Sequence, residues 1–172
     1  MSVSETIERG IASEKIRVII FAILLALLIL MPFLIHFQWI TGPTVNAALF
    51  IATVILGPTR AILLGLMPST VALSAGLLPF ALAPMVPFIM LSNVILVLVF
   101  SYLYKKNYFV ALSVSAFLKF AFLHQTVTWV MSRFLENKIV ATLSIMMSWP
   151  QFFTALIGGL VAYVFLKQIK KV

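Results

Sequence analysis

The sequence predicts an all-α membrane protein with six transmembrane helices. Of its 172 residues, 63% are hydrophobic and only 9% are charged, and the mean hydropathy is +1.19. Soluble domains are about 45–50% apolar, with about a quarter of their residues charged, so this chain lacks the polar side chains to cover a globule of its size. We therefore expect a single integral membrane domain that comprises residues 1–172.

Six apolar segments are long enough to cross a bilayer, which takes about 20 helical residues, or fewer where the flanks reach toward the interface. The predicted spans cover about residues 17–36, 44–56, 61–78, 86–104, 108–131 and 139–166. The second span is short because Gly-Pro dipeptides at 42–43 and 57–58 favour turns. Pro68 and Pro150 are expected to kink their helices without ending them, since neighbouring groups can satisfy the freed carbonyls.

A separate polar segment, residues 1–15, precedes the first span. Ser2 and Glu5 have the spacing of a capping box, and Val3, Ile7 and Ile11 recur every four residues along one side of a helix. This pattern fits a short helix lying on the cytoplasmic face of the membrane. A frayed tail is the alternative, because three acids suit an anionic membrane surface poorly.

The basic residues predict the orientation. The net charge is +8, but the basic residues lie between apolar runs instead of on one solvated face, so nucleic acid is not expected as a partner. With both termini inside, nine of the twelve basic residues are cytoplasmic, namely Arg9, Lys15, Arg17, Arg60, Lys105, Lys106, Lys167, Lys170 and Lys171. Arg133 and Lys138 are then outside, and Lys119 lies within a span. Because Lys and Arg concentrate in cytoplasmic loops, we expect a plasma-membrane protein with cytoplasmic termini.

The composition argues against an enzyme. The chain has four acidic residues, all Glu, and no Cys, which leaves little for carboxylate or thiol chemistry. It also lacks the G-x-x-x-x-G-K-[ST] loop that binds nucleotide phosphates. His36 and His124 are the only histidines, and two distant histidines do not make a metal site. We expect no enzymatic activity, no metal and no cofactor.

Two stretches resemble a known family. They are GPTVNAALFIATVILGPTRAILLGL at 42–66 and LPFALAPMVPFIMLSNVILVLVF at 78–100. Together with the six short spans, they resemble the substrate-binding S components of energy-coupling factor (ECF) transporters, in a branch without an assigned substrate. The resemblance implies a ligand that enters from outside and binds in the outer half of the bundle. It also implies a transmembrane coupling subunit and two ATPase subunits as partners.

The first span contains a pair of small residues, Ala22 and Ala26. Small residues four apart lie on one helix face and let another helix approach closely, which is a main source of helix association in lipid. The resemblance implies that such a pair docks the S component onto the coupling subunit. Packing within the monomer is the alternative.

Polar residues gather on two of the predicted helices. On the fifth they fall within a sector of about 120°, which holds Lys119, Gln125, Thr126, Trp129 and Arg133. On the sixth, a stripe about 100° wide is polar at its outer end and small at its inner end; its members are Ser144, Ser148, Gln151, Ala155, Gly158, Gly159 and Ala162. Asn93 and Asn46 are expected to face the same volume.

Lys119 is the most informative of these residues. An ammonium near mid-span costs at least about 2.5–3.5 kcal/mol, and no acid lies within any predicted span to pair with it. It therefore faces an anionic ligand or a water-filled cavity, or it snorkels to the interface. Trp129 could equally anchor its helix at the membrane surface. The predicted substrate contacts are Lys119, Gln125, Trp129, Asn93, Ser148 and Gln151.

These observations predict a membrane-embedded subunit that captures a small neutral or anionic nutrient, such as a vitamin, for an ATP-driven importer. The alternative is a membrane anchor or assembly subunit of a redox complex, which would also show apolar spans and small-residue faces. A lysine in mid-membrane beside a polar cluster favours substrate capture.

Overall fold

The computed structural model describes residues 3–35, 37–77, 80–134, 147–170 and 172. Its elements are α1 (Val3–Leu34), α2 (Gln38–Leu56), α3 (Pro58–Ser74), the 3-10 helix η1 (Phe80–Met85), α4 (Val86–Leu103), α5 (Tyr108–Phe134) and α7 (Trp149–Gln168). The described residues thus contain six α-helices, and the predicted all-α fold is confirmed. Five helices are long and apolar enough to cross a membrane, whereas α3 has only 17 residues.

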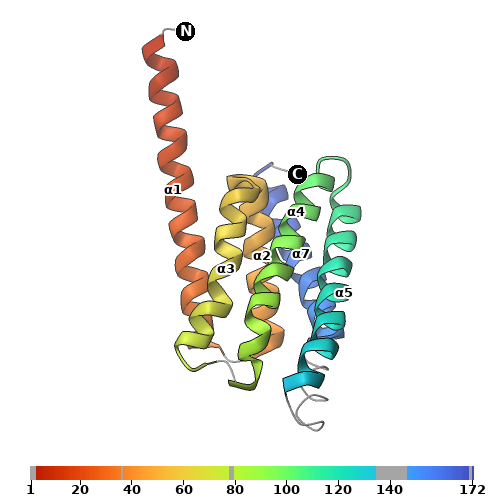
Figure 1. Cartoon of the computed structure of the whole chain (residues 1–172). Coiled ribbons are helices and arrows are strands. Elements are labelled where there is room, and N and C mark those ends of the chain that lie inside the picture. Colours follow the sequence, from red (N-terminus) through yellow and green to blue (C-terminus); the bar gives the residue numbers. More distant parts are fainter. Residues whose placement is uncertain (1–2, 36, 78–79, 135–146, 171) are drawn as a thin grey trace.

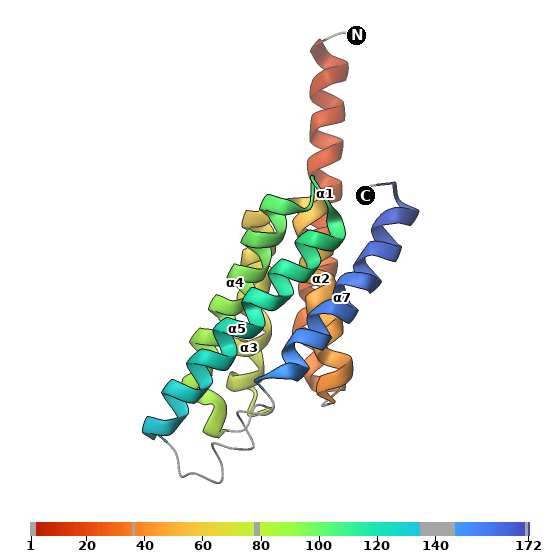
Figure 2. The same ribbon diagram turned by 90° about the vertical axis from the view of Figure 1, so that its right-hand side faces the viewer.

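The helices run alternately up and down, so that both termini lie at one end of the bundle (Figure 1). We call this end the terminal end. It also carries the α2–α3 and α4–α5 connections, while the α1–α2 and α3–α4 connections lie at the opposite end (Figures 1 and 2). Which end faces the cytoplasm stays a prediction.

Helix α1 is longer than the predicted first span. It runs without a break from Val3 to Leu34, so the structure shows no separate interfacial helix before residue 17. The reason is local, because the stretch from 3 to 17 contains no proline and only one glycine, Gly10. The amino-terminal part of α1 extends beyond the other helices (Figure 1). Near the point where it leaves the bundle, the Arg60 guanidinium donates to the Glu14 carboxylate at 3.0 Å.

The two Gly-Pro dipeptides behave differently. Gly57 has φ 91° and ψ 165°, a conformation that is essentially restricted to glycine, and Pro58 begins α3, so this dipeptide separates two helices as predicted. The prediction for 42–43 was wrong, because α2 begins at Gln38 and contains Pro43. Pro43 leaves only the Trp39 carbonyl without its helical donor, close to the start of α2, so the helix continues past it.

The other prolines also differ from one another. Pro68 is buried inside α3, which continues past it as predicted. Pro150 does not kink a span: it is the second residue of α7, where the missing N–H would have no helical partner. The predicted start of the last span, at residues 139–146, lies outside the described residues.

An aromatic cluster fills the core near the terminal end. Phe100 packs edge-to-face on Phe50 and on Tyr108, with ring centroids 4.6 and 5.2 Å apart. Tyr108 also packs against Tyr163 and donates its hydroxyl hydrogen to the Gly159 carbonyl at 2.8 Å. These contacts join α2, α4, α5 and α7, and they close the core on the side away from the α1–α2 connection.

Candidate functional site

A partly open cavity of about 270 Å³ lies toward the end opposite the termini. Its walls come from the last turn of α1, the first turns of α2, the second half of α3 and the first half of α4, and they are completed by Lys119 of α5 and Gln151 of α7. The lining residues are Pro32, Ile35, Gln38, Thr41, Gly42, Val45, Asn46, Pro68, Ser69, Ala72, Leu77, Ile89, Asn93, Lys119, Met147 and Gln151. This size is near the lower limit for small-molecule sites, which are about 300–1,000 Å³.

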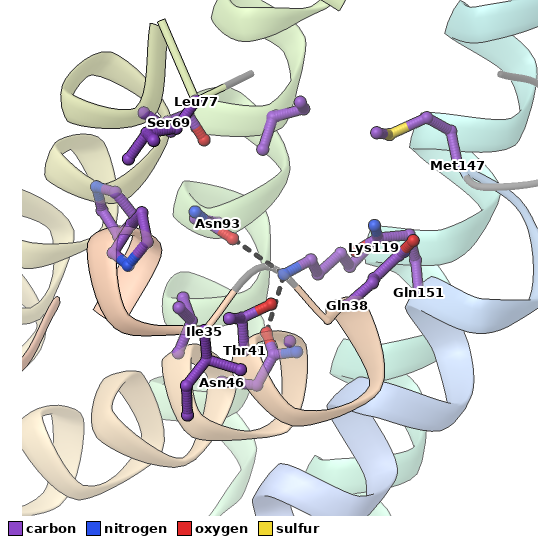
Figure 3. A pocket seen from close by; sticks show the side chains of 16 residues that line it. Ile35, Gln38, Thr41, Asn46, Ser69, Leu77, Asn93, Lys119, Met147 and Gln151 are labelled. Atoms are coloured by element: carbon purple, nitrogen blue, oxygen red, sulfur yellow. Dashed lines mark hydrogen bonds between the residues drawn. The ribbon is translucent and has the colours of Figure 1, made fainter. Parts of the chain in front are cut away.

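Lys119 lies at the inner side of this cavity and joins three helices. Its Nζ donates to Asn46 Oδ1 of α2 at 2.7 Å and to Asn93 Oδ1 of α4 at 2.8 Å (Figure 3). The three side chains are 3%, 1% and 3% exposed, respectively. Asn46, Asn93 and Lys119 therefore face one volume, and their contact with a substrate stays a prediction.

The orientation of Asn93 is fixed from both sides. Its Nδ2 donates to the Gly65 carbonyl of α3 at 2.8 Å, and a carbonyl can only accept, so Asn93 Oδ1 must face the lysine. Gly65 allows this short approach, since a Cβ there would lie 3.2 Å from Asn93 Cβ. The hydrogen-bonded chain from Gly65 to Lys119 thus holds α3, α4 and α5 together.

Asn46 is held by the contact of α2 with α7. A Cβ at Gly158 would lie 2.6 Å from the Pro43 carbonyl oxygen, 2.8 Å from Asn46 Cβ and 2.9 Å from the Ala47 nitrogen. Only glycine permits this backbone contact. Ala155, Gly158, Gly159 and Ala162 of the small stripe predicted on the last helix are all buried. Gly158 makes the contact with α2, and Gly159 packs against Leu112 of α5. Ser144, the first residue of that stripe, lies outside the described residues.

The site has an excess of positive charge. Lys119 is the one charged side chain among the described residues that line the cavity, and its two hydrogen-bond partners are neutral amides. The sequence has no Asp or Glu between residues 15 and 135. Glu136 follows the end of α5, which lies about 22 Å along the helix from Lys119 at 1.5 Å per residue. Amide dipoles therefore surround this ammonium where a carboxylate would be the usual partner.

The predicted contacts fall into two groups. Lys119, Asn93 and Gln151 line the cavity, and Ser148 is buried at the amino-terminal cap of α7. Gln125 and Trp129 are exposed and are not among the lining residues. Their role as contacts stays a prediction, and Trp129, which is 56% exposed, also fits the interfacial anchor given as its alternative.

The helix geometry explains this division. From Lys119 onwards, the buried residues of α5 are Lys119, Phe120, Leu123 and Val127, so the centre of the buried face in this half of the helix lies about 55° to one side of Lys119. The predicted polar sector extends about 120° to the other side. The members of the predicted polar sector share one side of α5, but in this half of the helix only the edge that holds Lys119 points into the bundle.

Three polar lining residues were not predicted from the sequence: Gln38, Thr41 and Ser69. The first two lie in a stretch that was assigned to a loop, because α2 was expected to begin after Pro43. If the helix is extended backwards, positions 38, 41, 42 and 45 have the i, i+3, i+4, i+7 spacing of one helix face. That spacing could have indicated them.

Ala22 and Ala26 lie on the outside of the bundle. Both are exposed on α1, whereas Leu24 and Leu28 of the same helix are buried against the core. Packing of the alanine pair inside the monomer, the alternative considered above, is therefore not what the structure shows.

Among the described residues, no group of three or more His, Cys, Asp or Glu side chains is placed to hold a metal ion. The polar groups that line the cavity are amides, hydroxyls and one ammonium. Amide and hydroxyl oxygens bind metals only weakly when no carboxylate is present. All of these polar groups are suited to hydrogen bonding with an organic solute.

A bundle of apolar helices with a mostly apolar cavity that holds a few polar groups and one buried lysine is typical of a membrane-embedded solute-binding protein. Residues 16–169 match the family described as ECF transporter, substrate-specific component. The chain therefore belongs to this family, whose members are non-enzymatic, substrate-binding transport subunits that work with an energizing module. No curated protein and no solved structure matches the chain.

Proposed function

We propose that this S component captures a small neutral or anionic nutrient from outside the cell, in the cavity that ends at Lys119. The observation that supports this proposal most directly is the buried cluster of Lys119, Asn46 and Asn93, which offers a charge and amide groups to a solute. Membership of the family favours this function over the alternative of a redox-complex anchor.

The proposed direction of capture rests on the positions of the basic residues. Arg60, Lys105 and Lys167 belong to helix ends or connections at the terminal end of the bundle. Arg17 of α1 lies at the same end, because it lines a small hollow together with Gly57 and Lys105. If this end is cytoplasmic, as the excess of Lys and Arg indicates, the cavity opens to the outside. The cluster at Lys119 and the aromatic core then lie between the cavity and the cytoplasm.

Capture is tested by the stability of the purified protein with candidate solutes. A solute at 100 times its Kd should stabilise the fold by about 2.7 kcal/mol, which is measurable as a rise in Tm. Screening vitamins and small organic acids should give such a rise, and Gln151→Leu should weaken it. Gln125→Ala and Trp129→Ala test the two exposed positions, and unchanged binding in both would remove them from the site. A broad screen without any stabilisation, together with no small molecule retained by the purified protein, would contradict capture.

We further propose that α1 docks the protein onto the transmembrane coupling subunit of the energizing module, which also contains two ATPase subunits. Ala22 and Ala26 lie near the middle of the exposed face of α1, where a partner helix can approach closely. The double variant Ala22→Trp, Ala26→Trp should lose co-purification with the module, because two indoles would hold the helices apart.

Leu34→Trp is the matched control for this experiment. Leu34 is exposed on the same helix but lies about 100° around it from the alanine pair and close to the cavity end. This variant should co-purify normally. Equal retention of the module by the double variant and by wild type would show that docking uses another surface.

A further inference from the structure

The cavity is specific enough to indicate the chemistry of its ligand. We propose that the solute is a small aliphatic monocarboxylate that binds with its carboxylate at Lys119 and its hydrocarbon part against the cavity wall. This inference rests on the capture function proposed above and narrows it from a neutral or anionic nutrient to one class of compound.

Lys119 gives the site a positive charge that its protein partners do not neutralise. An ammonium has three N–H donors, and Lys119 directs two of them to Asn46 and Asn93. These amides lower the cost of burying the cation but bring no negative charge to it. A ligand carboxylate can accept the third hydrogen and neutralise the charge, and such charge-assisted hydrogen bonds are about twice as strong as neutral ones.

The charges in the lining indicate how many negative charges the ligand has. Among the described lining residues there is one cation and no anion, so a single negative charge on the ligand leaves the site neutral. A dianionic phosphate would leave one negative charge buried without a partner, which is strongly unfavourable at low dielectric. The geometry therefore favours a monoanion.

The walls and the volume of the cavity indicate the rest of the ligand. Around the polar cluster the lining consists of branched aliphatic side chains, prolines and a methionine: Ile35, Val45, Leu77, Ile89, Pro32, Pro68 and Met147. Gln38, Thr41 and Gln151 interrupt this wall on the side where Lys119 enters the cavity (Figure 3). A volume of about 270 Å³ corresponds to on the order of ten non-hydrogen atoms, at about 30 Å³ for each water-sized group. A short aliphatic acid with one or two hydroxyl or amide groups fits both the size and the polarity.

The test compares acids with their neutral isosteres on the purified full-length protein. Isovalerate, hexanoate and 4-hydroxybutyrate are each titrated beside the primary amide of the same skeleton, with benzoate as an aromatic acid of equal charge. The acids should bind about 10- to 100-fold more tightly than their amides, as expected for a hydrogen bond to a charged group. The best aliphatic acid should also bind more tightly than benzoate.

Variants assign this preference to Lys119. Lys119→Met keeps the length of the side chain without the charge and should remove the preference for acids, whereas Lys119→Arg should keep it. Lys105→Met is the control, because Lys105 lies in the α4–α5 connection at the terminal end and outside the cavity. If Lys119→Met does not fold, the comparison of acids with amides on the unaltered protein still decides the question.

The outcomes separate this inference from the function on which it rests. Amides that bind as tightly as acids, or a preference for acids that survives Lys119→Met, would overturn the carboxylate site and leave capture intact. Tighter binding of benzoate would overturn the aliphatic part. If neither set binds and mass spectrometry finds no retained small molecule, both the inference and capture fail.

Discussion

Replacing Gly158 by alanine is expected to destabilise the protein by about 2 kcal/mol and to weaken solute binding at the same time. The added Cβ would lie within 3 Å of backbone atoms of Pro43 and Ala47, and neither can move away without displacing α2. It would also press on Asn46, which holds Lys119. Unfolding in detergent with increasing denaturant measures the stability, and solute titration measures the binding.

Gly159→Ala is the matched control for this prediction. The three atoms nearest to a Cβ at Gly159 all belong to the side chain of Leu112, which can change its rotamer, whereas at Gly158 two of the three nearest are α2 backbone atoms. We therefore expect a smaller loss of stability, about 1 kcal/mol, and normal solute binding. If the two variants lose the same stability, the backbone contact of α7 with α2 is not what makes glycine necessary at 158.

Asn93→Leu is expected to destabilise the fold by about 3 kcal/mol, because it leaves Lys119 buried with one hydrogen-bond partner. The second change Lys119→Met should restore most of that loss, since the charge that needed a partner is then gone. A double-mutant cycle measured by denaturant unfolding should give a coupling free energy of about 2 kcal/mol between the two positions.

The double variant also separates stability from function. It should fold nearly as well as wild type and yet fail to bind the solute that wild type binds. The opposite outcome would be additive losses, with the double variant less stable than either single variant. It would mean that burying the lysine costs the fold no net free energy and that the amides are not needed to solvate it.

Much of this fold follows from hydrophobic periodicity and length. Apolar runs of about 20 residues predicted both ends of α4 and α5 to within three residues. For α1 they predicted the carboxyl-terminal end to within two residues. Apart from the early start of α1, the errors arose at prolines. Pro43 lies inside α2 and Pro150 opens α7, and no local rule distinguishes these cases, because the outcome depends on hydroxyls and neighbouring helices that satisfy the backbone.

The candidate site could be predicted in part. An intramembrane lysine without an acid in its span is costly enough to indicate a site. Asn46 and Asn93 could be placed near it because they lie toward the outer ends of their predicted spans. Gln125 and Trp129 could not be placed by the same reasoning, since helical spacing gives their angles relative to Lys119 but not the direction of the core. That direction is set by the contacts of α5 with α4 and α7 and is known only from the assembled bundle.

The two ends of the bundle differ in how far their helices can separate. At the terminal end a single residue, Gly57, joins α2 to α3, and residues 104–107 join α4 to α5. At the other end, 11 residues including η1 connect α3 to α4. The long α3–α4 connection lets these two helices separate at the mouth of the cavity, whereas residues 35–37 keep α1 close to α2 at the same end. Any adjustment that admits a bulkier solute will therefore widen the mouth between α3 and α4.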